Sequence, residues 1–160
     1  MPKLIIVRGN SGSGKTTVSK ILQEKFGRNT MLISHDMIRR QILNAKEAEA
    51  LPLIMQLVGY GRKHSEITIL EGILSTEVYM PLFELAIQEY GKDIFAFYYD
   101  LSFEETLRRH NTKPNREEFS EQDMRRWWKE KDFIHIIPEK ILVRDLSISD
   151  TVDMIYELVV

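Results

Sequence analysis

The glycine-rich stretch near the N-terminus is the part of this sequence best suited to chemistry. Gly9 to Thr16 reads GNSGSGKT and matches the pattern GxxxxGK[ST]. In that pattern backbone N–H groups surround phosphate oxygens, the lysine contacts the β- and γ-phosphates, and the final hydroxyl binds the Mg²⁺ that bridges them. Lys15 and Thr16 take the last two roles. The motif therefore predicts a site for a nucleoside triphosphate and Mg²⁺.

The context of the motif separates it from an ordinary glycine-rich turn. An aliphatic run precedes it and a helical periodicity follows it, which is the arrangement that its mechanism requires. No guanine-reading NKxD element is present, so ATP is favoured over GTP. The residues expected to contact the nucleotide are Gly9, Asn10, Ser11, Gly12, Ser13, Gly14, Lys15, Thr16 and Thr17.

An acid and a base stand three residues apart after the second apolar run. Asp36 and Arg39 would share one helix face. At the carboxyl edge of a parallel sheet, Asp36 could accept the proton of an attacking hydroxyl, and Arg39 could hold a substrate anion. The same spacing also fits an ordinary surface ion pair, which the sequence leaves open.

A carboxylate ends the third apolar run. Glu71 follows Ile67 to Leu70 directly and precedes Gly72. At a strand tip it could contact Mg²⁺ directly or through water, or contact the substrate. The alternative is an acidic side chain that is merely solvated at the end of a strand.

Cations gather between residues 108 and 116. Arg109 and Lys113 belong to this segment, which predicts a lid over residues 108–128 that closes on the triphosphate and excludes water. The residues alone leave open which of these cations acts in catalysis. The alternative is that basic residues at a helix C-terminus complement the helix dipole. Of Arg125 and Arg126, only one is expected to face inward.

Strand and helix patterns alternate along the chain, which predicts a three-layer α/β domain with a largely parallel sheet. Ser102 and Ser149 are the expected N-caps of two helices, with Glu105 completing a capping box behind Ser102. The expected strands are residues 4–7, 31–33, 67–70, 94–99 and 141–143. The expected helices are residues 15–26, 36–43, 45–64, 77–89, 102–110, 121–131 and 150–160.

Composition narrows the classes of protein. The 160 residues suit one domain over residues 1–160, and a formal charge of −2 gives no bulk attraction to nucleic acid or anionic lipid. Cysteine is absent, which excludes thiolate nucleophiles and Cys-held metals. The scattered histidines show no metal-ligand spacing. Apolar runs are too short for a signal peptide or a membrane span, so a cytoplasmic protein is expected.

Together these motifs resemble the small P-loop kinases grouped around the polynucleotide 5′-hydroxyl kinase domain, the zeta toxins and chloramphenicol phosphotransferase. The resemblance spans residues 3 to 145. It implies a P-loop NTPase fold with a five-stranded parallel sheet in the order 2-3-1-4-5 and a short helical lid. It also implies that Asp36 is the general base, that Arg39 contacts a substrate or active-site anion, and that Arg109 and Lys113 are lid cations near the nucleotide. The second lid cation of polynucleotide kinases is normally Arg, where this chain has Lys113.

The sequence thus predicts an ATP- and Mg²⁺-dependent kinase that phosphorylates a hydroxyl of a small molecule, such as a nucleoside or another metabolite. Residues 40–65 and 73–90 are expected to build the acceptor pocket. Three alternatives stay open: a polynucleotide 5′-hydroxyl kinase, a nucleotide hydrolase acting as a switch, and a nucleotide sensor that binds another protein. The absence of an obvious basic channel makes nucleic acid the less favoured substrate. The sequence leaves the oligomeric state open.

Overall fold

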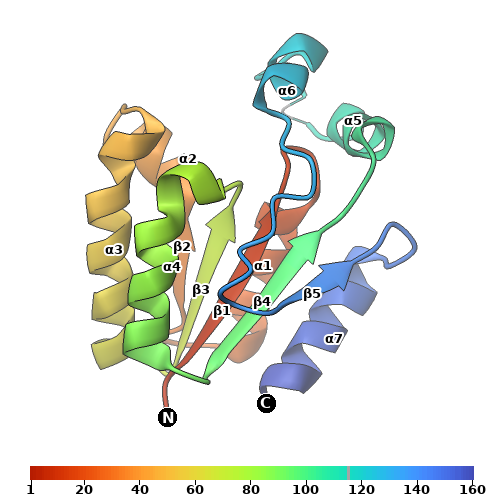
Figure 1. The fold of residues 1–160 in the computed structure, drawn as a ribbon. Helices are drawn as coiled ribbons and strands as arrows, with labels where there is room; N and C mark the ends of the chain where they lie inside the picture. The colour runs from red at the N-terminus through yellow and green to blue at the C-terminus, as the bar shows by residue number, and fades with distance from the viewer. Residues whose placement is uncertain (115) are drawn as a thin grey trace.

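The computed structural model describes residues 1–114 and 116–160. Its centre is a five-stranded sheet in which every neighbouring pair of strands is parallel, in the order β2-β3-β1-β4-β5 (Figure 1). This order is the one implied by the family resemblance, so the predicted fold is confirmed. The strands are β1 (Lys3–Gly9), β2 (Met31–Ser34), β3 (Ile67–Gly72), β4 (Ile94–Tyr99) and β5 (Glu139–Leu142).

Helices cover both faces of the sheet, as a parallel sheet requires. On β1, Leu4 and Ile6 face the core layer beneath α3 (Glu47–His64) and α4 (Thr76–Tyr90). Ile5 and Val7 face the opposite core layer, beneath α1 (Lys15–Phe26) and α7 (Ile148–Val159). All four of these side chains are fully buried. The continuous aliphatic run therefore places β1 at the centre of three layers (Figure 1).

Two further helices, α5 (Phe103–Asn111) and α6 (Glu121–Trp127), stand above the edge at which the parallel strands end (Figure 1). We call the described residues 103–114 and 116–127 the lid. Residues 129–138, here called the strap, lead from the lid back to β5 without regular secondary structure. Asn115, which falls within the predicted lid over residues 108–128, lies outside the described residues.

The segment after β2 is helical, but not as one regular helix. A short α2 (His35–Met37) passes into a π-helical turn over Ile38–Ile42, in which the Leu43 N–H donates to the Ile38 carbonyl at 3.0 Å. This i→i+5 bond is wider than an α-helical one, and such turns occur often at functional sites. The turn carries two arginines of the candidate site, Arg39 and Arg40.

Several predicted element ends are wrong. The last helix begins at Ile148 and is capped by Ser147, whose hydroxyl accepts from the Asp150 N–H at 3.0 Å, so Ser149 is not the cap. The helix predicted to end near residue 131 ends at Trp127. The last strand covers Glu139–Leu142 rather than residues 141–143.

The predicted capping box at the start of α5 is half correct. The Ser102 hydroxyl accepts from the Glu105 N–H at 3.1 Å. The Glu105 carboxylate instead binds Arg108 and Arg109, because two guanidinium groups one turn ahead compete for it better than one backbone N–H.

Arg8 is a charged side chain that lies inside the core. Arg8, near the end of β1, is fully buried and pairs with Asp132 and Glu139, each at 2.9 Å, while its guanidinium also donates to the Leu74 carbonyl. Asp132 in turn accepts from the backbone N–H and the hydroxyl of Thr76, the first residue of α4. A buried charge is tolerated only when it is paired and hydrogen-bonded, and here Asp132 of the strap and Glu139 of β5 supply the pairing.

The helices give no sign of a membrane segment. Over residues 1–114 and 116–160, none combines the length and the apolar composition needed to cross a bilayer.

Candidate active site

The glycine-rich loop lies between β1 and α1, where its motif requires it. Gly14 is the N-cap of α1 with φ 101°, and no side chain caps the first turn of that helix. The first N–H groups of α1 therefore remain available to bind an anion. Gly12 has φ 86°, and a Cβ at that position would lie 2.5 Å from the Thr106 carbonyl oxygen of α5. The lid thus rests on the loop at a point where only glycine fits.

Lys15 is the first residue of α1, directly after the loop, and is 9% exposed. Its ammonium donates to the Asn10 carbonyl at 3.2 Å. Burial lowers the pKa of Lys15 from its ordinary value, while the Glu71 carboxylate opposes that shift. A buried cation held beside uncapped N–H groups is well suited to bind phosphate.

Thr16, Ser34 and Glu71 form a group of hard oxygen atoms beside Lys15. The Glu71 carboxylate is 1% exposed, and its Oε2 accepts from the Thr16 hydroxyl at 2.7 Å and from the Ser34 hydroxyl at 3.2 Å. Oxygen ligands of this kind suit Mg²⁺, which usually takes few protein ligands and completes its shell with phosphates and water. Thr16 and Glu71 therefore fit the predicted metal role. No group of three or more acidic or histidine side chains gathers around a possible metal position within residues 1–114 and 116–160.

Asp36 projects from α2 into the same region, together with two arginines of the π-helical turn. Its Oδ1 lies 3.5 Å from Nη2 of Arg39 and 3.2 Å from Nε of Arg40. The predicted ion pair with Arg39 therefore exists, with a second arginine added. Asp36 is about half exposed, as the surface ion-pair interpretation requires, and its side chain also lines the cavity described below.

His35 is the buried neighbour of Asp36. Its Nε2 lies 2.7 Å from the Tyr79 hydroxyl, which donates its own proton to the Glu47 carbonyl at 2.8 Å. His35 must then donate through Nε2–H. Burial lowers the pKa of His35 to about 4, so the ring is neutral near pH 7.

The lid reaches the loop through Arg109. Its Nη1 donates to the Ser13 carbonyl at 2.6 Å, and its Nη2 donates to the Arg144 carbonyl at 3.3 Å. The Glu105 carboxylate accepts a hydrogen bond from Nε of Arg109 at 3.1 Å. Hydrogen bonds from Arg108 and then from Arg109 lower the pKa of Glu105 to about 2. Arg109 is thereby fixed at the loop. Burial lowers the pKa of Lys113, and the Glu71 carboxylate opposes this shift, so Lys113 lies within electrostatic range of Glu71.

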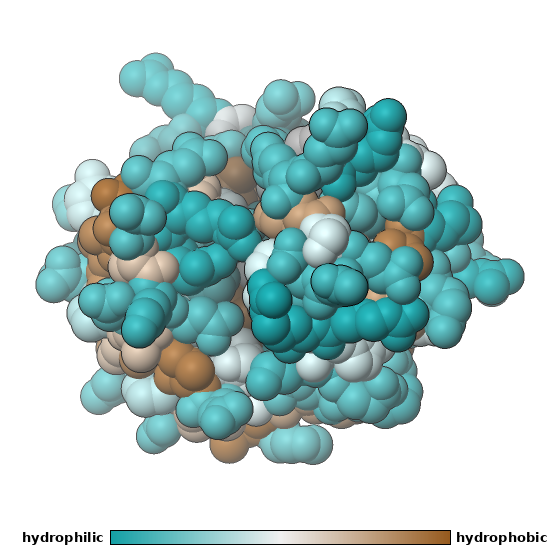
Figure 2. Space-filling model, turned by 90° about the horizontal axis from the view of Figure 1, so that it is seen from above, coloured by the Kyte–Doolittle hydropathy of each residue, from teal (hydrophilic) through white to brown (hydrophobic). Residues whose placement is uncertain are grey.

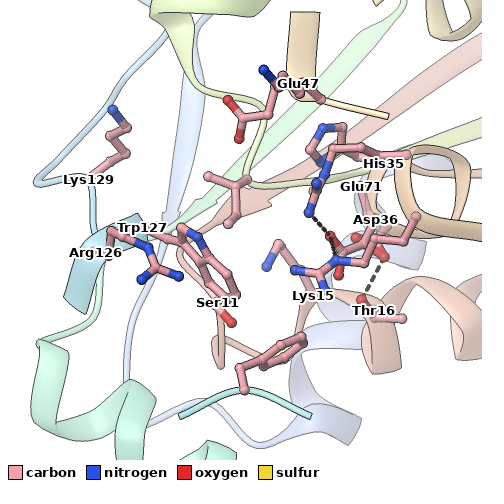
Figure 3. A pocket seen from close by; sticks show the side chains of 16 residues that line it. Ser11, Lys15, Thr16, His35, Asp36, Glu47, Glu71, Arg126, Trp127 and Lys129 are labelled. Carbon is pink, nitrogen blue, oxygen red and sulfur yellow. Dashed lines mark hydrogen bonds and ion pairs between the residues drawn. The ribbon is translucent and has the colours of Figure 1, made fainter. Parts of the chain in front are cut away.

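A cavity of about 390 Å³ joins these parts, a volume within the usual range for small-molecule sites (Figure 3). Seen from the lid end, the surface is mostly hydrophilic and is hollowed between two lobes (Figure 2). Among the described residues, six of the lining side chains are cationic and three are acidic. The lining consists of Ser11, Lys15, Thr16, His35, Asp36, Arg39, Arg40, Lys46, Glu47, Glu71, Gly72, Ile73, Phe119, Arg126, Trp127 and Lys129.

Comparison with known proteins supports the architecture. Residues 1–60 match the model of the zeta toxin family. This segment holds the glycine-rich loop, Asp36 and Arg39, but it is less than half of the chain. No curated protein matches the sequence.

Solved structures resemble nearly the whole chain. An APS kinase from Mycobacterium tuberculosis in complex with AMPPNP and APS has a TM-score of 0.71 at 19% identity, covering 98% of this chain and 96% of its own. A gluconokinase from Sinorhizobium meliloti 1021 has a TM-score of 0.66 at 14% identity, covering 99% and 94%. A shikimate kinase from Acinetobacter baumannii in complex with shikimate has a TM-score of 0.61 at 16% identity, covering 99% and 93%.

The fold is that of a small P-loop kinase. The glycine-rich stretch is accordingly its P-loop, and the family resemblance drawn from the motifs is confirmed at the level of the fold. With identities below 20%, these likenesses concern the architecture and leave the substrate of this chain open.

The structure brings six of the fourteen predicted site residues to one cavity, and Arg109 and Lys113 are not among them. Ser11, Lys15, Thr16, Asp36, Arg39 and Glu71 line one cavity. Thr17 is exposed on α1, and the Ser13 hydroxyl turns inward to the Asn10 carbonyl at 2.6 Å. Of the two adjacent arginines in α6, Arg126 lines the cavity and Arg125 does not, as expected.

The predicted acceptor-pocket segments contribute only at their ends. Arg40, Lys46, Glu47 and Ile73 line the cavity, whereas the middle of α3 and most of α4 belong to the core. The remaining wall comes from the lid and the strap.

Sequence reasoning missed the contacts of Asn10. Its side chain accepts from the Lys129 N–H at 2.7 Å and donates to the Lys129 carbonyl at 2.7 Å, so it ties the P-loop to the strap. It also missed Lys129, Trp127 and Phe119 as lining residues. The spacing of these three residues in the sequence follows no helical or strand periodicity, so it did not indicate that their side chains line the same cavity.

Proposed function

We propose that this protein is an ATP- and Mg²⁺-dependent kinase that transfers the γ-phosphate to a hydroxyl group of a small molecule. The observation that carries the proposal is that Lys15 and Asp36 line one cavity. They follow β1 and β2, whose carboxyl ends meet at one edge of the sheet. A phosphate donor and a hydroxyl acceptor could therefore be held side by side in one enclosed space.

The roles follow from the contacts. Lys15 and the N–H groups of the P-loop would hold the β- and γ-phosphates, and Thr16 and Glu71 would hold Mg²⁺, which neutralises charge on the phosphates. Asp36 would accept the proton of the acceptor hydroxyl as its oxygen bonds to the γ-phosphorus. The bond from that phosphorus to the β-phosphate oxygen would break, releasing ADP.

The lid would supply positive charge to the phosphoryl group in transit. Arg109 already contacts the P-loop at Ser13, and Lys113 lies near Glu71. Arg39, beside Asp36, would contact an anion of the substrate or of the active site. Preorganised cations of this kind stabilise charge that develops in the transition state.

The test is acceptor-dependent ADP release, measured with ATP, Mg²⁺ and a panel of nucleosides, sugars, aliphatic alcohols and short 5′-hydroxyl oligonucleotides. Asp36→Asn is expected to lower transfer by roughly 10²–10⁴-fold, the usual contribution of a general base, while leaving ATP binding intact. Glu24→Gln, an exposed carboxylate change on α1, is the matched control and is expected to leave transfer unchanged.

Other outcomes would favour the alternatives. ATP hydrolysis that needs no acceptor and is unchanged by Asp36→Asn would indicate a hydrolase or switch. ATP binding without turnover on any acceptor would indicate a nucleotide sensor. Phosphorylation confined to the oligonucleotides would identify a polynucleotide kinase.

A further inference from the structure

Arg40, in the π-helical turn after β2, makes contacts on both sides of the cavity. On its own side, its Nε donates to Oδ1 of Asp36 at 3.2 Å. On the lid side, its Cζ lies 5.0 Å from the centroid of the Phe119 ring and 5.4 Å from that of the Trp127 ring. Figure 3 shows Asp36 and Trp127 on opposite sides of the cavity. Arg40 therefore connects the expected general base to the lid.

The two rings beside Arg40 are held in place within the lid. Phe119 and Trp127 meet edge to face, with their ring centroids 5.4 Å apart. On α5, the buried His110 ring stacks on Phe119 at 5.7 Å, and its Nε2 lies 2.9 Å from the Phe119 carbonyl oxygen. A guanidinium beside such rings is attracted to their faces by a cation–π interaction. The position of the Arg40 side chain therefore depends on the position of the lid.

The two oxygens of the Asp36 carboxylate differ in their contacts. Oδ1 lies near both arginines of the turn, with Nε of Arg40 at 3.2 Å and Nη2 of Arg39 at 3.5 Å. Over residues 1–114 and 116–160, no ion pair or hydrogen bond reaches Oδ2. Because Asp36 is about half exposed, its carboxylate could turn about its side-chain bonds if neither oxygen were held. Holding Oδ1 fixes the carboxylate and leaves Oδ2 to accept a proton.

We propose that Arg40 is a positioning residue for phosphoryl transfer. Held against the lid rings, its guanidinium would fix Oδ1 of Asp36 and so direct Oδ2 at the acceptor hydroxyl. The base would then be oriented when the lid covers the cavity, which is also when water is excluded from the phosphoryl group in transit. In this role Arg40 acts through Asp36 and binds neither the acceptor nor the nucleotide. The inference rests on the proposed kinase function and adds a link between the lid and the base.

The main test is whether the effect of Arg40 requires Asp36. Arg40→Gln is expected to lower kcat by about 10–30-fold, because a misoriented base slows the reaction without weakening binding. KM for ATP and KM for the acceptor should each change less than about twofold. In an Asp36→Asn background, the same change should lower kcat less than about twofold, because no base is left to orient. Arg40→Lys keeps the charge and should retain at least about one third of the wild-type kcat.

A second comparison tests the part played by the lid rings. Phe119→Leu removes the ring nearest to Arg40 and is expected to lower kcat about 3–10-fold, but less than about twofold once Arg40→Gln is present. Phe103→Leu is the matched control, because Arg125 lies 4.2 Å from the Phe103 ring centroid within the lid and neither residue lines the cavity. This control should keep kcat within about twofold of wild type. Both phenylalanine variants leave Arg40 in place, so a poorly folded Arg40 variant would not remove the test.

The possible failures are distinct. A loss of kcat below about threefold for Arg40→Gln, or an equal loss in the Asp36→Asn background, would overturn the role given to Arg40 and leave the kinase function intact. A rise in KM for the acceptor at unchanged kcat would also overturn it, because Arg40 would then bind the acceptor. Equal losses for Phe119→Leu and Phe103→Leu would overturn the link to the lid. Absence of transfer by the wild-type protein to every acceptor would overturn the proposed function and this inference with it.

Discussion

The two walls of the cavity are held in different ways. The wall formed by the P-loop and the strand ends is part of the core: Lys15, His35 and Glu71 are all buried. The wall formed by the lid and the strap lies at the surface, where the side chains of Arg126 and Lys129 are 67% and 44% exposed. The first wall is positioned by the sheet, and the second by ion pairs and a few hydrogen bonds.

This difference separates two tasks. Phosphate chemistry needs charged groups that stay in place without water, which burial provides. Recognition of a particular acceptor needs side chains that can vary without disturbing the core, which an exposed lid provides. Substitutions in the first wall should therefore abolish or strongly reduce phosphoryl transfer. Substitutions in the second wall should have smaller effects on kcat and should change which acceptor is used.

The largest effect is expected from removing the P-loop cation of the first wall, Lys15. Lys15→Ala is expected to lower phosphoryl transfer by about 10³-fold, because a buried charge that contacts the transferring phosphate acts mainly in the transition state. Lys20→Ala, on an exposed lysine of the same helix, is the control. The measurement is kcat/KM for ATP, and a loss smaller than tenfold would contradict the role given to Lys15.

The next change tests whether the first wall depends on the strap. Arg8→Met is expected to lower the free energy of unfolding by about 3–5 kcal/mol, because it leaves Asp132 and Glu139 without their cation. Urea unfolding followed by circular dichroism measures the loss. Adding Glu139→Gln to Arg8→Met should recover part of it, whereas a loss below about 1 kcal/mol would show that the network contributes little.

Two adjacent arginines of α5 allow a lid residue that contacts the P-loop to be compared with one that is exposed to solvent. Both bind Glu105, but only Arg109 reaches the Ser13 carbonyl, and their side chains are 18% and 65% exposed for Arg109 and Arg108. Arg109→Ala is expected to lower kcat by about 10²-fold, as for loss of one preorganised donor. Arg108→Ala should change kcat less than about threefold. Equal effects would mean that the contact with the P-loop is not what matters.

The smallest expected effect is a pH dependence of stability that comes from His35, a buried residue of the first wall. The pKa of His35 is about 4 in the folded chain and near 6.5 when unfolded, so the unfolded state binds more protons between these values. Stability should therefore fall as pH falls, by about 2 kcal/mol from pH 7 to pH 5 for this group. Urea titrations of wild type and His35→Gln should differ by that amount in their pH dependence; parallel curves would contradict the assignment.

The first wall was largely predictable from the sequence because its residues stand at fixed positions beside regular elements. Lys15 and Thr16 belong to a motif of defined spacing, Glu71 is the next-to-last residue of β3, and Asp36 stands two residues after the end of β2. In a parallel sheet those positions meet at one edge whatever the connecting loops do. The strand order itself came from the family resemblance and not from periodicity.

The second wall was not predictable in the same way. Phe119, Trp127 and Lys129 lie in or beside segments with little periodicity, and their positions depend on contacts with distant residues. Arg40 reaches the rings of the lid across about 80 residues of sequence, and Asn10 meets Lys129 across 119. Neither contact could be read from a pattern of neighbouring residues in the sequence. The misplaced cap at Ser149 has a simpler reason, since Ser147 and Ser149 both stand near the start of α7 and can serve as N-caps.

The burial of Arg8 also has a consequence for how the protein is made. Its two carboxylate partners lie 124 and 131 residues further along the chain, so the ribosome completes them long after β1 has been synthesised. A nascent chain that stops short of Asp132 would have to keep this cation in water or bury it unpaired, and water is far less costly. The P-loop at the end of β1 should therefore reach its final form only after the lid and the strap have emerged, so the earliest part of the site to be translated would be among the last to be completed.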